Sequence, residues 1–105
     1  MITNQILQSS LDDLKTITRV DLGLFDLSGE VVVATANMKS PENDIIVAFA
    51  ESAADSQMIG SFHLLKVKEE QELIYILVAQ GFGEDTYMVG RIATAQVGRL
   101  ISAYK

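Results

Sequence analysis

The first segment of the chain has the spacing of an amphipathic helix. Apolar residues recur every three to five positions from Ile2 to Ile17, and polar residues fill the intervals. A helix with about 3.6 residues per turn places residues at this spacing on one face. The pattern predicts a helix from about Asn4 to Thr18 that packs one face against the rest of the domain.

The period of the pattern changes after this segment, from that of a helix to that of strands. Two apolar runs, at residues 22–27 and 30–35, flank a connection with Asp26 at its first position and Gly29 at its fourth. Asp and Gly favour these two positions of a β-turn. We therefore expect a β-hairpin.

A second helix is expected to begin near Ser40. Ser40 would be its N-cap, Pro41 its first residue and Glu42 a carboxylate near the positive end of the helix dipole. Its buried face would carry the apolar residues of the next turns, which are Ile45, Ile46, Phe49 and Ala53.

Two further extended segments and a third helix complete the pattern. Residues 58–68 are expected to form a strand with a bulge at Gly60, and residues 73–79 are apolar on both faces, as in a strand covered on both sides. Residues 84–86 offer N-cap chemistry for a helix over 87–104.

The predicted order is α-β-β-α-β-β-α, which indicates an α+β fold. Four or five mostly antiparallel strands would form a central sheet, with the middle helix on one face and the two terminal helices on the other. This α/β/α arrangement would bury both faces of the strand at 73–79.

The last helix carries small residues and apolar residues on more than one face. Gly90, Ala93, Ala95 and Gly98 would let another backbone approach closely. Two interpretations remain open: packing against the first helix alone, or a homodimer contact as well. The candidate interface residues are Met88, Arg91, Ala95, Gly98 and Ile101.

Length and charge limit the classes of function. A chain of 105 residues with one apolar core is expected to be a single domain, and without cysteine it fits a reducing, cytoplasmic location. The longest apolar run, 73–79, is too short to span a bilayer, so no membrane contact is expected. A net charge of −6 opposes contact with nucleic acid, although residues 86–105 contain three bases and no acid.

The sequence lacks the motifs of catalysis and of cofactor binding. His63 is the single histidine, the chain has no G-x-S-x-G, and strand alternation places His63 opposite Phe62 and Leu64. One histidine without cysteine leaves only carboxylates as further metal ligands, and the sequence has neither an EF-hand loop nor a His-x₃-His pair. The glycines match neither a P-loop nor a dinucleotide motif. We therefore expect no enzyme activity, no metal and no cofactor.

Four segments resemble the N-terminal sensory domain of bacterial PucR-type and sugar-diacid-type transcription regulators. They are LDDLKTITRVD (11–21), FDLSGEVVVAT (25–35), ESAADSQ (51–57) and DTYMVGRIA (85–93), and LISAYK (100–105) resembles the helix that leads to the next domain. The resemblance implies a signal-receiving fragment of a longer regulator whose DNA-binding domain lies elsewhere. The element order is also similar to that of profilin, PAS, GAF and roadblock/longin domains.

Two functions follow from these likenesses. One is a sensory module that binds a small-molecule effector between the sheet and the middle helix, and the other is a roadblock-like dimeric scaffold without such a site. For the first, the candidate ligand-binding residues are the polar ones near the expected pocket: Arg19, Thr35, Ser52, Ser56, Gln57, His63 and Tyr75.

Overall fold

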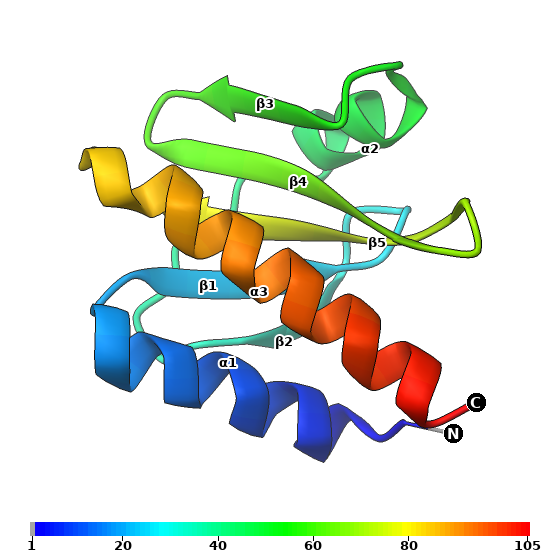
Figure 1. Cartoon of the computed structure of the whole chain (residues 1–105). Coiled ribbons are helices and arrows are strands. Elements are labelled where there is room, and N and C mark those ends of the chain that lie inside the picture. Colours follow the sequence, from blue (N-terminus) through cyan, green and yellow to red (C-terminus); the bar gives the residue numbers. More distant parts are fainter. Residues whose placement is uncertain (1) are drawn as a thin grey trace.

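A computed structural model describes residues 2–105, which form three helices and one five-stranded sheet. Every strand pair is antiparallel, and the strands lie in the order β2-β1-β5-β4-β3 (Figure 1). The elements in chain order are α1 (Asn4–Thr18), β1 (Asp21–Phe25), β2 (Val31–Ala34), α2 (Asn43–Glu51), β3 (Ser56–Ile59), β4 (Phe62–Glu69), β5 (Glu72–Gln80) and α3 (Glu84–Ala103).

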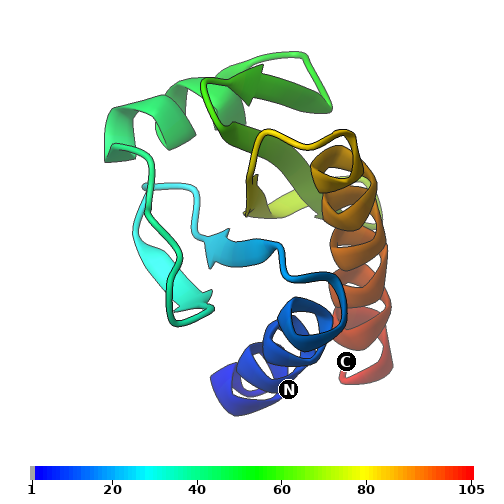
Figure 2. The same ribbon diagram turned by 90° about the vertical axis from the view of Figure 1, so that its left-hand side faces the viewer.

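The helices cover the two faces of the sheet as the sequence predicts. Helices α1 and α3 lie side by side and antiparallel on one face, and α2 lies on the other (Figures 1 and 2). One apolar cluster joins α1 and α3 to the sheet, and a second joins Ile46 and Phe49 of α2 to its opposite face. The predicted α+β fold in three layers is therefore confirmed.

Strand β5 lies at the centre of the sheet between β1 and β4. Ile76 and Val78 pack in the cluster under α2, whereas Leu77 and Ala79 pack under α1 and α3. All four side chains are fully buried. The apolar run thus has the predicted cause over residues 76–79, where neither face of the strand is exposed to solvent.

The segment predicted as one strand with a bulge is instead a hairpin. Strands β3 and β4 pair in antiparallel register, and Gly60 and Ser61 form the turn between them. Gly60 has φ +59, a backbone conformation that glycine adopts without the steric cost that other residues meet. The element order is accordingly α-β-β-α-β-β-β-α, with five strands.

The starts of the second and third helices also differ from the prediction. Helix α2 begins at Asn43 with Glu42 as its N-cap, so Ser40 and Pro41 precede it. The β1–β2 turn fixes this start, because Gly29 packs directly against the backbone of Asn43. Helix α3 begins at Glu84, whose carboxylate lies in the first turn, where the helix dipole favours negative charge.

Candidate functional site

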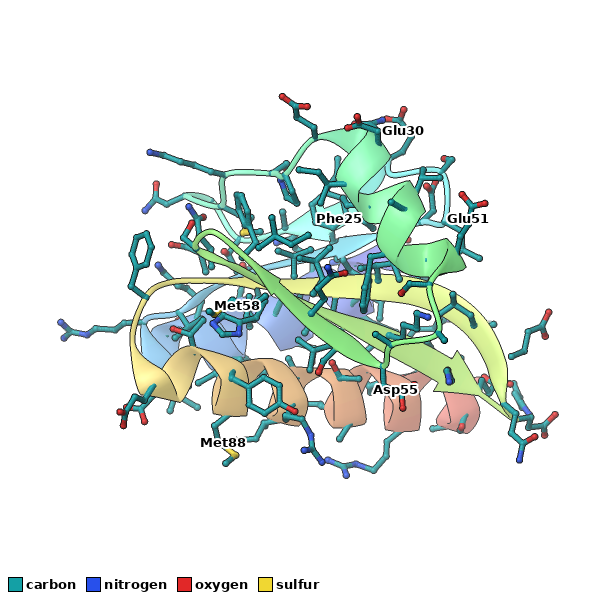
Figure 3. The ribbon with its side chains drawn as sticks, turned by 90° about the horizontal axis from the view of Figure 1, so that it is seen from above. Phe25, Glu30, Glu51, Asp55, Met58 and Met88 are labelled. Atoms are coloured by element: carbon teal, nitrogen blue, oxygen red, sulfur yellow. The ribbon has the colours of Figure 1, made fainter. Side chains whose placement is uncertain are left out.

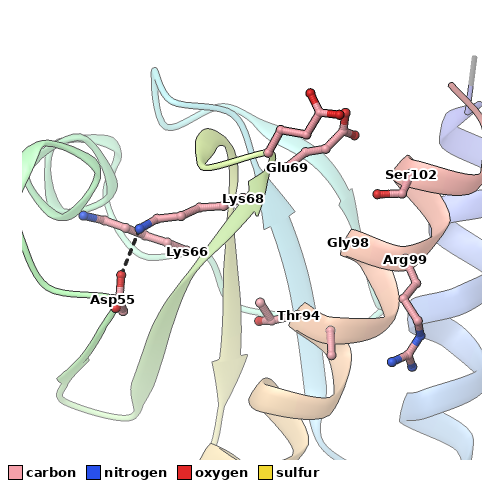
Figure 4. A pocket seen from close by; sticks show the side chains of 10 residues that line it. Asp55, Lys66, Lys68, Glu69, Thr94, Gly98, Arg99 and Ser102 are labelled. Carbon is pink, nitrogen blue, oxygen red and sulfur yellow. Dashed lines mark hydrogen bonds and ion pairs between the residues drawn. The ribbon is translucent and has the colours of Figure 1, made fainter.

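A groove runs between α3 and the β3–β4 hairpin, on the face of the sheet that α1 and α3 cover only in part. It consists of three hollows of about 830, 510 and 260 Å³. Asp55, Lys66, Thr94 and Ala95 line both the first and the second, and Ser56 and Tyr87 line both the second and the third. Figure 4 shows the widest hollow from close by. We call the three together the α3–β4 groove.

The narrow end of the groove collects polar and aromatic side chains from three elements. The Tyr87 ring of α3 lies 6.1 Å from the His63 ring of β4, centroid to centroid, and the Arg91 guanidinium lies 5.9 Å from the Tyr87 ring. Hydrogen bonds from Arg91 and from Ser56 of β3 lower the pKa of the Tyr87 hydroxyl. A cation and two hydroxyls therefore meet beside the edge strand.

The middle of the groove carries more positive than negative charge. Lys68 forms an ion pair with Asp55 at 3.1 Å (Figure 4), whereas Lys66 donates to the backbone oxygen of Ser52 and lies 5.2 Å from the centre of the Phe49 ring. The carboxylate of Asp55 is thus opposed by Lys66, Lys68 and Arg91. Over the two larger hollows together, the lining has four bases (Lys66, Lys68, Arg91 and Arg99) and three acids (Asp55, Glu69 and Glu70), a sum of −3 + 4 = +1 in a chain whose net charge is −6.

The floor of the groove on the helix side is made of small residues. Thr94, Ala95 and Gly98 of α3 line it, and the Thr94 hydroxyl is buried without a hydrogen-bond partner in the described part of the chain. Figure 4 shows the Thr94 side chain directed from α3 toward the hollow. A buried hydroxyl without a partner is a group that an incoming donor or acceptor would satisfy.

The wide end of the groove is closed by ion pairs. Lys105 lies 2.8 Å from Glu69 and 2.5 Å from Glu70, both at the β4–β5 turn. The hydrogen bond from Lys105, and then its charge, lower the pKa of Glu70. The two carboxylates in turn raise the pKa of Lys105. These contacts hold the end of α3 near the turn, and the single charge of Lys105 offsets one of the two carboxylates there.

Three of the seven predicted ligand-binding residues meet in this groove, and the other four lie elsewhere. Ser56, Gln57 and His63 line its narrow hollow. Arg19 is exposed at the end of α1, and Ser52 ends α2. Thr35 is buried at the end of β2, and Tyr75 of β5 packs beside the cluster under α1 and α3.

Thr35 has a structural role in the sheet. Its hydroxyl accepts a hydrogen bond from the Leu22 N–H at 3.1 Å and donates one to Asp21 at 2.8 Å. The layer between α2 and the sheet, where the pocket was expected, is filled by apolar side chains of the second cluster.

The five predicted interface residues fall on two neighbouring faces of α3. Met88 and Ala95 are exposed, and Ile101 is half-buried against the core. Arg91 and Gly98 line the groove together with Ala95. The groove thus brings together some of the predicted ligand-binding residues and some of the predicted interface residues, which the sequence analysis treated as separate sets. Tyr87 and Thr94 were missed, although they lie one helical turn from Arg91 and Gly98.

Two further features bear on metals and membranes. Among residues 2–105, no group of three or more His, Cys, Asp or Glu side chains is placed to hold a metal ion. None of the helices described has the length and apolar character that crossing a membrane requires.

The hydrogen-bond donors at the narrow end of the groove, Arg91, Tyr87 and Ser56, are suited to binding a carboxylate.

A scan against protein-family models matched none of them, and a search of curated proteins also found no match.

Proposed function

We propose that this domain is a non-catalytic dimerisation scaffold of a bacterial transcription regulator, and that two copies associate through the outer surface of α1 and α3. The regulator context rests on the resemblance of the four segments given above. The observation that carries the dimer is the exposed apolar surface of α3. Met88 is 59% exposed and Ile92 is 47% exposed, one turn apart on the same face.

Helix α3 already has a buried face, so this second apolar face is not needed for folding. Val89, Ala93 and Val97 pack on the sheet, and Gln96 bonds Ser10 of α1 at 2.8 Å. Met88 and Ile92 point away from these contacts. Large side chains exposed in a group often mark a protein–protein interface.

Helix α1 carries a further exposed apolar side chain. Ile17 lies in its last turn and is 78% exposed. Figure 1 shows α1 and α3 antiparallel and closest where α1 begins and α3 ends, so Ile17 lies at the end of α1 that diverges from α3. Burying a large aliphatic side chain fully contributes about 1.5–3 kcal/mol, and a specific interface buries at least about 1,000 Å² in total.

The packing under α2 favours the scaffold over a sensor with its ligand in that layer. Phe25, Phe49, Leu64, Ile76 and Val78 fill the layer with side chains that are almost fully buried. A small-molecule site usually combines apolar walls with a few convergent polar groups. The polar groups that do converge, Ser56 and His63 among them, lie on the other face of the sheet.

The proposal is tested by measuring the mass of the chain in solution with multi-angle light scattering over a range of concentrations. We expect a dimer for the wild type and a monomer for the double variant Met88→Glu/Ile92→Glu, since four carboxylates would meet at the two-fold contact. Val31→Glu is the matched control, because Val31 is 55% exposed on β2, away from α3. A wild type that stays monomeric at high concentration contradicts the proposal.

A further inference from the structure

We propose that the outer edge of β3 binds an extended, acidic segment of a partner protein, which adds a strand to the sheet and places a carboxylate against Arg91. This inference is independent of the dimer proposed above, because it uses the edge of the sheet and the groove instead of the outer face of α1 and α3. Figure 3 shows the edge strand, with Met58 at one end and Asp55 just before the other.

The backbone of β3 offers free hydrogen-bonding groups at this edge. The Lys66 N–H donates to the Asp55 oxygen at 3.1 Å, so these two residues form a hydrogen-bonded pair. In an antiparallel ladder such pairs alternate along the strand. Gln57 and Ile59 therefore direct their backbone groups toward β4, while the N–H and C=O of Ser56 and Met58 point outward. Within the described chain these outward groups have no partner.

The strand lacks two of the features that usually protect an edge from pairing, although it is only four residues long. Ser56–Ile59 contains no charged residue and no proline, and Met58 is 67% exposed. The opposite edge is different, since the Gln8 side chain of α1 donates to the Ala34 oxygen of β2 at 2.7 Å. Strand β3 is thus the edge at which a peptide can pair with free backbone groups.

The charges beside β3 determine which kind of peptide segment would pair with this strand. Arg91 and Lys66 both line the second hollow, but the Lys66 ammonium is bound to the Ser52 oxygen, so Arg91 is the cation left for a ligand there. The one carboxylate in this hollow, Asp55, is already paired with Lys68. Within residues 2–105 the Arg91 guanidinium forms no ion pair, and it lies at the ring and hydroxyl of Tyr87. A glutamate or aspartate on the added strand would receive charge-assisted hydrogen bonds from Arg91. A second copy of β3 would bring only Asp55, which precedes the strand and is already paired with Lys68, and it would add its own Arg91.

The groove gives the side chains of such a segment a place to lie. Residues of an added strand alternate between the two faces of the sheet, so every second side chain would point toward α3. Ala95 and Leu65 offer an apolar surface there, and the buried Thr94 hydroxyl offers an unsatisfied polar group. One acidic side chain flanked by apolar ones therefore matches the groove.

The first experiment measures binding of a fluorescein-labelled peptide by anisotropy. The peptide is a short run of threonine and valine with one central glutamate, and the comparison peptide has glutamine in its place. We expect the glutamate peptide to bind more tightly, and Arg91→Ala to weaken it by about tenfold or more. Arg99→Ala is the matched control, because Figure 4 shows the Arg99 guanidinium directed away from Asp55 and Lys68.

The second experiment tests pairing through the backbone. Met58→Pro removes an N–H that points outward and leaves the ladder to β4 intact, which is the position where an edge strand tolerates proline. We expect Met58→Pro to abolish peptide binding and Met58→Thr, which keeps the N–H, to retain it. Circular dichroism of both variants checks that the fold is preserved.

Three results would overturn the inference. The first is equal affinity for the glutamate and glutamine peptides, and the second is unchanged binding by Met58→Pro. The third is a dimer that Met58→Pro converts to a monomer while the acidic peptide does not bind, which would assign the β3 edge to a second copy. A dimer lost in Met88→Glu/Ile92→Glu but kept in Met58→Pro leaves both the scaffold and this inference standing.

Discussion

At the scale of single residues, the turn between β1 and β2 is held by hydrogen bonds to one carboxylate. Asp26 accepts hydrogen bonds from the Ser28 hydroxyl at 2.7 Å, the Ser28 N–H at 2.9 Å and the Glu30 N–H at 3.0 Å. The bond from Ser28, and then that from Glu30, lower the pKa of Asp26 below its ordinary value of 3.8. The ionised form of Asp26 therefore stabilises the hairpin that fixes the start of α2.

This carboxylate predicts a pH dependence of stability. Because the folded pKa lies below the unfolded one, its contribution is present above pH about 4 and is lost as the pH falls through the folded pKa. We expect Asp26→Asn to unfold at lower urea concentration than the wild type at neutral pH, and the difference to shrink in acid. Asp13→Asn, an exposed carboxylate of α1, is the control and should show no such trend. A difference that is constant with pH contradicts the assignment.

Alternation along a strand predicted the face on which each residue lies, but not the residue that it meets. His63 lies opposite Phe62 and Leu64 as expected, because the two faces of a strand alternate. Its contact with Tyr87 depends on where α3 crosses the sheet. Gly90 permits this crossing, since a side chain there would come within 2.9 Å of Leu65. The pattern of a single strand does not contain that information.

At the scale of elements, the central strand is the part of the fold that its own sequence specifies best. The apolar run at 73–79 predicted a strand covered on both faces, and β5 is buried by both layers of helices. The β3–β4 hairpin was missed, although Gly60-Ser61 between two apolar runs is a known hairpin signal. The start of α2 could not be predicted locally, because contact with Gly29 decides it.

The burial of β5 predicts how much stability the domain loses when a side chain of this strand is shortened. Ile76 is fully buried in the cluster under α2, so Ile76→Ala is expected to cost about 2–5 kcal/mol of the roughly 5–15 kcal/mol that a domain possesses. Leu73 is half-buried near the hairpin end, and Leu73→Ala should cost less. Urea denaturation of the two variants beside the wild type measures both losses. Equal and small losses would contradict a strand covered on both faces.

At the scale of the whole molecule, the candidate site arises where three elements meet. Ser56, His63 and Tyr87 come from β3, β4 and α3, so their approach depends on the order of the strands and on the angle of the helix. The sequence predicted two of these residues as polar candidates near a pocket, but it predicted that pocket on the α2 face. The apolar layer under α2 fills that space, and the open face beside α3 collects the polar groups instead.

The distribution of charge also predicts how the whole domain behaves toward DNA. The net charge is −6, and several bases are already engaged in ion pairs: Lys15 with Asp21, Lys68 with Asp55, and Lys105 with Glu69 and Glu70. Binding to a duplex without sequence preference requires clustered Lys and Arg that release counterions from the phosphates. Of the five bases outside these pairs, Arg19, Lys39, Lys66, Arg91 and Arg99, only the last two share an element, and two arginines do not supply such a cluster.

We therefore expect no shift of a duplex in a native gel at micromolar protein and physiological salt. Lowering the salt should not produce binding either, because the acidic surface repels the phosphates more strongly when screening is weak. The control is a variant in which Glu69 and Glu70 are both replaced by Gln, since this frees Lys105 and removes two acids from the hollow that Arg99 lines. A complex of the wild type that weakens with salt would contradict the prediction and would make the last helix a surface for nucleic acid.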